Sequence, residues 1–335
     1  MKKKSDHLPA PRREIEDLKP VHHGAPDHLE LESLGLTPDQ VLDFSVNSSP
    51  FGPSPRVRKV LQSVPLDRYP DREALQFRRL LSQRLDIEPD RILAGNGTAE
   101  LLWLVSGAYL TSDSKVLVLQ PTFGEYARSA RWMGAEVIAW TARSEDHFQY
   151  HPEAISGLLT SQSFQIVYIC NPNNPTGQLL APQVISAWAA ENPRTLFLID
   201  EAYLAFTEEA PTMLNNPLAN LLILRSMTKD YALAGLRLGY AVGSQEVIST
   251  IRKIRPPWNV NALAQAAGCA ALQDASHLQE SIQKIRLEKR FLVRSLKTHG
   301  FFPLPSAAHY FLLRVGNGAA FRTALLEDRI QVRDC

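Results

Sequence analysis

Apolar residues along the chain follow two spacings, one typical of helices and one typical of buried strands. Over residues 73–85 they recur largely at helical spacing and predict an amphipathic helix: Ala74, Leu75, Phe77, Leu80, Leu81 and Leu85. Short apolar runs, often β-branched, occupy residues 115–119, 136–140, 165–170, 195–199, 221–224 and 238–242. Such near-continuous runs are expected of strands that helices cover on both faces. The pattern therefore predicts an α/β fold with a mostly parallel sheet.

The length of the chain, 335 residues, exceeds the size at which a single core keeps growing, so we expect two domains. We assign residues 1–20 to a loose N-terminal arm, 21–55 to an N-terminal segment of the small domain and 56–260 to the large domain. After the Pro256-Pro257 break, residues 261–335 are expected to form the small C-terminal α/β domain. Within it the pattern predicts a helical region over 262–299, a strand over 308–315 and a helix over 319–327.

Charge and composition narrow the class of partner. Lys and Arg number 36 and Asp and Glu 35, which gives no electrostatic reason to expect nucleic acid or an acidic membrane surface. No apolar stretch is long enough to span a bilayer, and the basic start lacks the apolar core of a signal peptide. The three cysteines form no close pair and fit no metal-ligand spacing. We therefore expect a cytoplasmic protein without a metal site, whose partner is a small molecule.

Residues with ionisable or hydrogen-bonding groups follow several of the predicted strands, at the positions where an open α/β sheet binds ligands. Asp200 follows the run 195–199, where a buried carboxylate needs a cationic partner, although a helix cap or a structural ion pair would also explain it. Lys229 follows 221–224 in a hydroxyl-rich turn where a deprotonated amine could attack a carbonyl; a surface lysine is the simpler alternative. Gly97, Thr98 and Ala99 open a helical run and offer either a phosphate site or a plain N-cap.

Three motifs, taken in their order and spacing, carry a resemblance to a known family. They are NPNNPTG at 171–177, where two prolines fix a loop that can aim an amide inward, DEAY at 200–203, and SMTK at 226–229 with Arg237 eight residues further on. The chain resembles the fold-type I pyridoxal-phosphate enzymes of the class I and II aminotransferase family, in the branch that holds histidinol-phosphate aminotransferase and threonine-phosphate decarboxylase. The resemblance covers His23 to Cys335. It implies a large domain with a mostly parallel sheet covered by helices, a smaller α/β domain, and pyridoxal 5'-phosphate as cofactor.

The resemblance also implies roles for residues of this sequence. Lys229 would hold the cofactor covalently and later move protons at the substrate's α carbon. Asp200 would pair with the pyridine nitrogen, Asn174 and Tyr203 with the phenolic oxygen, and Phe123 would stack on the ring. The cofactor phosphate would be held by the following residues: Gly97, Thr98, Ala99, Ser226, Thr228 and Arg237. Tyr69 would reach the cofactor phosphate of a neighbouring subunit, which implies a homodimer with shared sites.

For the substrate, the resemblance implies a small phosphorylated amino acid, with contacts from Arg333, His23 and Asn174. Four segments resemble the decarboxylases: an early His23-Gly24, Gly-Thr-Ala-Glu at 97–100, Pro-Trp-Asn-Val-Asn at 257–261, and the ending at 332–335. We therefore favour decarboxylation of L-threonine O-3-phosphate to (R)-1-amino-2-propanol phosphate in cobalamin synthesis. The alternative is transamination between histidinol phosphate and 2-oxoglutarate in histidine synthesis, which the segment at 47–53 would also suit.

The end of the sequence leaves a third alternative open. Enzymes of this branch normally continue into a strand that carries the arginine for the substrate's α-carboxylate, whereas this sequence stops at Cys335. We expect a fragment with a truncated small domain, and therefore also consider a cofactor binder without turnover.

Overall fold

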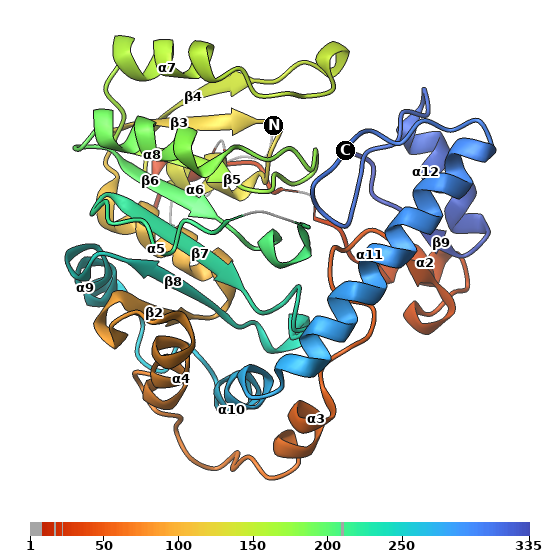
Figure 1. Cartoon of the computed structure of the whole chain (residues 1–335), viewed down its shortest axis with the longest axis horizontal. Helices are drawn as coiled ribbons and strands as arrows, with labels where there is room; N and C mark the ends of the chain where they lie inside the picture. The colour runs from red at the N-terminus through yellow and green to blue at the C-terminus, as the bar shows by residue number, and fades with distance from the viewer. Residues whose placement is uncertain (1–8, 17, 22, 209–210) are drawn as a thin grey trace.

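A seven-stranded sheet forms the centre of the computed structural model, which describes residues 9–16, 18–21, 23–208 and 211–335 (Figure 1). The strands lie in the order β2 (Ile92–Gly95), β8 (Gly239–Gly243), β7 (Leu221–Ser226), β6 (Leu196–Asp200), β5 (Ile166–Cys170), β3 (Lys115–Gln120) and β4 (Glu136–Thr141). Only β8 is antiparallel to its neighbours in this sheet; the other pairs are parallel. The predicted α/β fold with a mostly parallel sheet is confirmed; of the seven strands in this sheet, the sequence pattern missed the four-residue strand β2.

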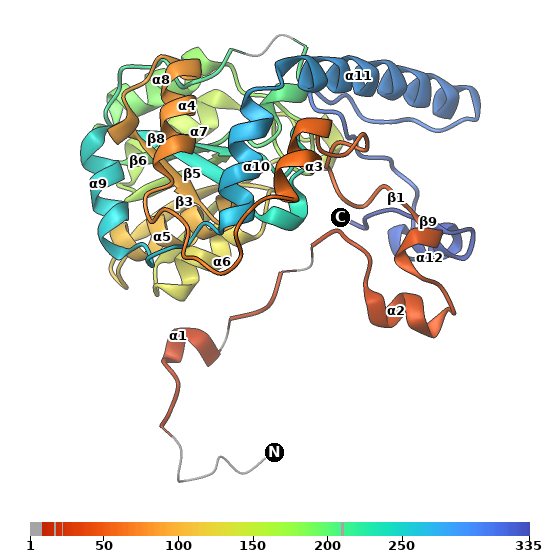
Figure 2. The same ribbon diagram turned by 90° about the horizontal axis from the view of Figure 1, so that it is seen from below.

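Helices cover both faces of this sheet (Figure 2). One face packs against α4 (Leu75–Leu85), α7 (Pro152–Ser161), α8 (Pro182–Glu191) and α10 (Ala262–Leu272), and the other against α5 (Gly97–Tyr109), α6 (Glu125–Trp132) and α9 (Gln245–Ile254). Successive residues of β7 alternate between the two cores: Leu221 and Ile223 face the first, Leu222 and Leu224 the second. Because neither face meets water, the strands read as continuous apolar runs.

A smaller body combines segments from both ends of the chain (Figure 1). Strand β1 (Leu42–Asp43) pairs in parallel with β9 (Ile330–Gln331), near α2 (His28–Ser33), α12 (Gly318–Glu327) and the long helix α11 (Ala275–Thr298). Arg322 of α12 donates two hydrogen bonds to the Glu30 carboxylate of α2, at 2.7 and 2.5 Å. The short helix α1 (Arg13–Glu16) lies away from this body, and α3 (Pro55–Leu61) packs against α10.

Two local predictions for the C-terminal part differ from the structure. The helical region over 262–299 is two helices, α10 and α11, and Asp274 accepts a hydrogen bond from His277 N as the N-cap of the second. Residues 308–315 form no regular strand; one isolated bridge joins Pro303 to Leu313. The Lys289 ammonium donates a hydrogen bond to the carbonyl of Ala308, so this backbone carbonyl accepts from a side chain and not from a neighbouring strand.

The division into domains stays a prediction, but the position of α10 bears on it. Ala264 and Ala267 of α10 belong to the same core as Phe77, and a Cβ on Gly268 would lie 2.5 Å from Leu238 Cδ2. We therefore propose that the large domain extends through α10. Among the described residues, no helix combines the length and apolarity that a bilayer crossing needs.

Candidate functional site

Three segments that are far apart in sequence meet at one edge of the sheet. Strand β2 ends at Gly95, β7 ends at Ser226, and β8 begins at Gly239, which is paired with both of those residues. The turns that follow β2 and β7, and the turn that precedes β8, therefore leave the sheet side by side. This register brings together the N-terminus of α5, the turn at 226–229 and the turn that contains Arg237.

The contacts between these turns are close. A Cβ on Gly97, whose φ is +75°, would lie 2.9 Å from the Arg237 guanidinium, and a Cβ on Gly239 would lie 2.8 Å from Thr98 N. The hydroxyls of Ser226 and Thr228, both buried, are 2.7 Å apart. Unpaired backbone N–H groups and the positive end of the helix dipole make the start of a helix such as α5 favourable for an anion. Hydroxyls, backbone amides and a guanidinium thus lie together at this edge of the sheet.

Lys229 lies directly after this cluster and is half-buried. Its Nζ is 5.8 Å from the centre of the Tyr203 ring, and its backbone carbonyl accepts a hydrogen bond from Ser49 N at 2.8 Å. Burial lowers the pKa of Lys229, and the nearby charges of Arg237 and Arg333 lower it further, while Asp200 opposes them. A lowered pKa increases the fraction of neutral amine, which is the nucleophilic form.

Asp200 is the last residue of β6, and its carboxylate is buried. The Tyr126 hydroxyl donates to Oδ2 at 2.8 Å, and the backbone N–H of Ala202 donates to Oδ1 at 3.0 Å. Burial raises the pKa of Asp200, whereas these two hydrogen bonds and the charge of Lys229 lower it. Each carboxylate oxygen therefore has a fixed donor within the protein.

Asn174 and Tyr203 are close to each other, as the resemblance implies. The Asn174 amide donates to the Tyr203 hydroxyl at 3.4 Å, and both side chains are buried. The loop that carries Asn174 is held by Asn173, whose amide donates to the Pro121 carbonyl at 2.8 Å and whose Oδ1 accepts from Thr122 at 2.6 Å. Burial raises the pKa of Tyr203, and the charge of Arg333 opposes this.

Phe123 connects the N-terminal segment with the residues behind Asp200. Its ring centre is 5.5 Å from that of His23 and 5.5 Å from that of Tyr126. His23 Nε2 lies 3.1 Å from the buried carboxylate of Glu125, which also accepts from Trp103 Nε1 at 3.1 Å. His23 is therefore held beside Phe123.

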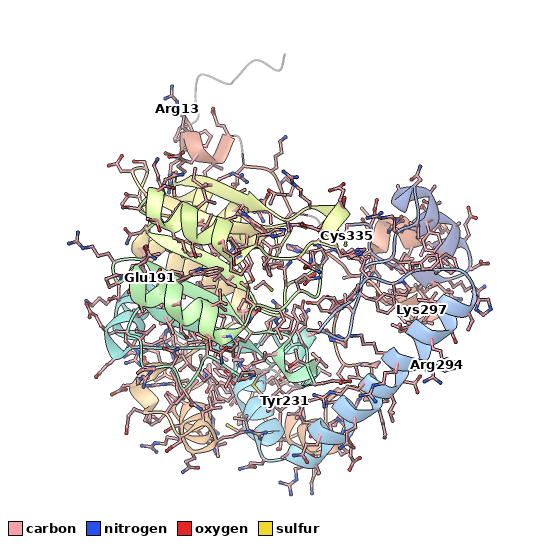
Figure 3. All side chains as sticks on the ribbon, turned by 45° about the horizontal axis from the view of Figure 1, so that its top comes forward. Arg13, Glu191, Tyr231, Arg294, Lys297 and Cys335 are labelled. Atoms are coloured by element: carbon pink, nitrogen blue, oxygen red, sulfur yellow. The ribbon has the colours of Figure 1, made fainter. Side chains whose placement is uncertain are left out.

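Arg333 and Tyr69 have different positions relative to this cluster. The charge of Arg333 acts to lower the pKa of both Lys229 and Tyr203, so the Arg333 guanidinium lies within electrostatic range of these two side chains. In Figure 3, the nearby end of the chain at Cys335 lies between the two bodies. Tyr69 is 80% exposed and stacks on Trp258 at 4.5 Å, beside a cavity of about 400 Å³. Within the described part of the chain, Tyr69 makes no hydrogen bond to Lys229, Thr228 or Arg237.

These residues fit pyridoxal phosphate by their chemistry. The Arg237 guanidinium, two hydroxyls and the start of α5 lie together, and these donors suit a phosphate dianion. The Lys229 amine, with its lowered pKa, suits an aldehyde carbon, and the Asp200 carboxylate suits a protonated ring nitrogen. A second cavity, of about 420 Å³, lies apart from these residues and is lined by Phe206, Arg286, Lys289 and Ser306, among others.

Two residues of the site, Glu125 and Tyr126, were not found from the sequence. Their positions directly after Pro121-Thr122-Phe123-Gly124, in the first turn of α6, were the only available signal. Glu125 contacts His23, and Tyr126 contacts Asp200; the two pairs are separated by 102 and 74 positions in the sequence. No local pattern predicts contacts over such separations.

Comparisons with known proteins give a consistent result. The model of the aminotransferase class I and II family matches residues 39–335. The histidinol-phosphate aminotransferase of Limosilactobacillus fermentum is 36% identical over 300 residues, which cover 87% of this chain and 82% of the relative. The threonine-phosphate decarboxylase of Salmonella typhimurium is 34% identical over 314 residues, 90% of this chain and 84% of the relative. The histidinol-phosphate aminotransferase of Sinorhizobium meliloti, solved with pyridoxal-5'-phosphate, superposes with a TM-score of 0.87 at 23% identity over 99% of this chain and 90% of that one.

Proposed function

Because the chain belongs to the class I and II aminotransferase family, we propose that it binds pyridoxal phosphate through Lys229 and transfers an amino group between histidinol phosphate and 2-oxoglutarate. The observation that carries the choice of reaction is the similarity to histidinol-phosphate aminotransferases at up to 36% identity along most of the chain. The sequence features favoured the decarboxylase, whereas the relatives favour the aminotransferase.

The cluster around Lys229 supports the chemistry of the proposal. When bound, pyridoxal phosphate supplies a ring that accepts the electrons of a breaking bond at the substrate's α carbon. The Lys229 amine, whose pKa is lowered by burial and by two arginines, can take and return the proton of that carbon. Asp200, fixed by Tyr126 and Ala202, can hold positive charge at the ring nitrogen. Asn174 and Tyr203 can donate to an anionic ring oxygen.

A phosphorylated substrate suits the nitrogen donors of Arg333 and His23. A guanidinium binds a phosphate with two parallel hydrogen bonds, and the charge of Arg333 reaches Lys229 and Tyr203. His23 is held next to Phe123 by Glu125. We propose that Arg333 and His23 bind the phosphate of the substrate.

Decarboxylation of L-threonine O-3-phosphate is a second candidate, favoured by one contact. Two of the sequence features that resemble the decarboxylases, 97–100 and 257–261, meet in the structure. Asn259 Nδ2 donates to Glu100 Oε2 at 2.7 Å, and the same oxygen accepts from Asn96 N at 2.6 Å. The two segments are thus joined at the start of α5. The similarity to a threonine-phosphate decarboxylase at 34% identity also supports this second candidate.

We also propose a cytoplasmic homodimer with shared sites. Tyr69 and Leu66 are 80% and 79% exposed, and Trp258 is 43% exposed beneath the Tyr69 ring. Aromatic and aliphatic side chains exposed together are typical of interfaces. A second copy covering this surface would bring Tyr69 toward its neighbour's cofactor phosphate.

Parallel turnover assays separate the two reactions. The cofactor-loaded protein is incubated with histidinol phosphate and 2-oxoglutarate, and separately with L-threonine O-3-phosphate, while glutamate, carbon dioxide and amino-propanol phosphate are followed by mass spectrometry. We expect glutamate in the first reaction, absent with Lys229→Ala. Carbon dioxide in the second reaction without glutamate in the first would contradict the proposed transamination and identify the activity as decarboxylation. Cofactor binding without either product would support the binder without turnover.

A further inference from the structure

A buried phenol stands behind the carboxylate of Asp200. Tyr126 has no exposed surface, and its hydroxyl donates to Asp200 Oδ2 at 2.8 Å. We propose that Tyr126 is a positioning residue, which fixes the plane of the Asp200 carboxylate against the ring nitrogen of the cofactor. This inference rests on the proposed binding of pyridoxal phosphate, and it holds for either reaction.

The position of the Tyr126 ring is itself fixed from several sides. It stacks on Tyr168 with ring centres 5.6 Å apart and planes inclined by 13°, and it meets Phe123 edge to face at 5.5 Å. The Tyr126 hydroxyl also interacts with the Cys170 thiol, but its acceptor at 2.8 Å is the Asp200 carboxylate. The same ring contacts Phe123, the aromatic residue expected to stack on the cofactor.

The Asp200 carboxylate depends on this donor because few other groups compensate its burial. Oδ1 has the Ala202 N–H and Oδ2 has the Tyr126 hydroxyl. Without the hydroxyl, the carboxylate could turn about its Cβ–Cγ bond, and its affinity for a proton would rise. It would then draw the proton of the ring nitrogen toward itself, and the ring would carry less positive charge.

A neighbouring tyrosine offers a matched control. Tyr168 is buried, lies against the same ring and also bears a hydrogen-bonded hydroxyl, but its partner is Ser106 rather than Asp200. Tyr126→Phe and Tyr168→Phe each delete one buried hydroxyl and keep the ring. A purely structural role for the hydroxyl of Tyr126 would make the two variants alike.

The test compares the holoenzymes of the wild type, Tyr126→Phe and Tyr168→Phe. The first measurement is the pH midpoint of the visible absorbance of the bound cofactor, which reports the protonation of its linkage to Lys229. Positive charge on the ring lowers that midpoint, so we expect Tyr126→Phe to raise it by on the order of one pH unit. The second is kcat, which should fall about 10- to 100-fold, as expected for losing a hydrogen bond to a charged group. Tyr168→Phe should keep the wild-type midpoint and kcat.

An unchanged midpoint in Tyr126→Phe, or an equal shift in Tyr168→Phe, would overturn the inference. The absorbance measurement needs no substrate, so it decides the role of Tyr126 even where the proposed substrates are not turned over. A protein that shows no cofactor absorbance at all would instead contradict the proposed function.

Discussion

Replacing Gly239 by alanine places a methyl group inside the contact between β8 and α5. The added Cβ would lie 2.8 Å from Thr98 N, 3.0 Å from the Gly97 carbonyl carbon and 3.1 Å from the Arg225 carbonyl oxygen. All three neighbours are backbone atoms, so none can move away by changing a rotamer. Thr98 N belongs to the N-terminus of α5, where we expect the cofactor phosphate.

The size of the effect follows from these distances. Moving Thr98 N to an ordinary contact distance requires a displacement of about 0.6 Å, in a region packed as densely as a protein interior. Overpacking of this kind costs about 1–3 kcal/mol. If the displacement falls on the phosphate-binding turn, the affinity for pyridoxal phosphate should fall about 5- to 150-fold, the factor that this free energy represents.

The assay titrates the apoprotein with pyridoxal phosphate and records the melting temperature of the apoprotein in parallel. Gly157→Ala is the control, because Gly157 lies within α7, is exposed, and an added Cβ there would meet nothing within 4 Å. We expect Gly157→Ala to stabilise the protein by about 0.5–1 kcal/mol without changing cofactor affinity. Wild-type cofactor affinity in Gly239→Ala would refute the assignment of the phosphate to this turn.

Two further predictions concern charges. Because the folded-state pKa of Lys229 is lowered, the unfolded chain binds more protons between that pKa and about 10.4, so the stability of the apoprotein should rise with pH in this window. Lys229→Met should therefore unfold at higher urea than wild type at pH 7, with the difference shrinking toward pH 10; a constant difference would contradict the lowered pKa. Arg225→Met removes the partner of the Glu201 carboxylate, whose side chain is 1% exposed, and should cost about 3–5 kcal/mol in urea unfolding. Arg290→Met, which opens the exposed pair with Glu208, should cost about 0–1 kcal/mol, and equal costs would rule out the buried pair as the cause.

The sheet could be predicted from the sequence because its strands are covered on both sides. Six strands read as apolar runs, whereas β2, with four residues between turns, is too short to stand out. The run at 308–315 was wrongly assigned to a strand because an apolar run does not reveal whether a hydrogen-bonding neighbour exists.

The site could be predicted in part for a related reason. Residues that follow parallel strands meet at one edge, so Asp200 and Lys229 could be placed together from the chain alone. Their roles came from the resemblance and stay predictions. Tyr126 could not be found, because its contact with Asp200 depends on how α6 packs against the sheet.

Both proposed reactions require that Lys229 carries pyridoxal phosphate. The most direct test is to reduce the cofactor-loaded protein with borohydride, digest it and locate the pyridoxyl group by peptide mass spectrometry. We expect the group on the peptide that contains Lys229, and its loss in Lys229→Ala. A pyridoxyl group on another lysine, or none on any peptide, would contradict the assignment of Lys229.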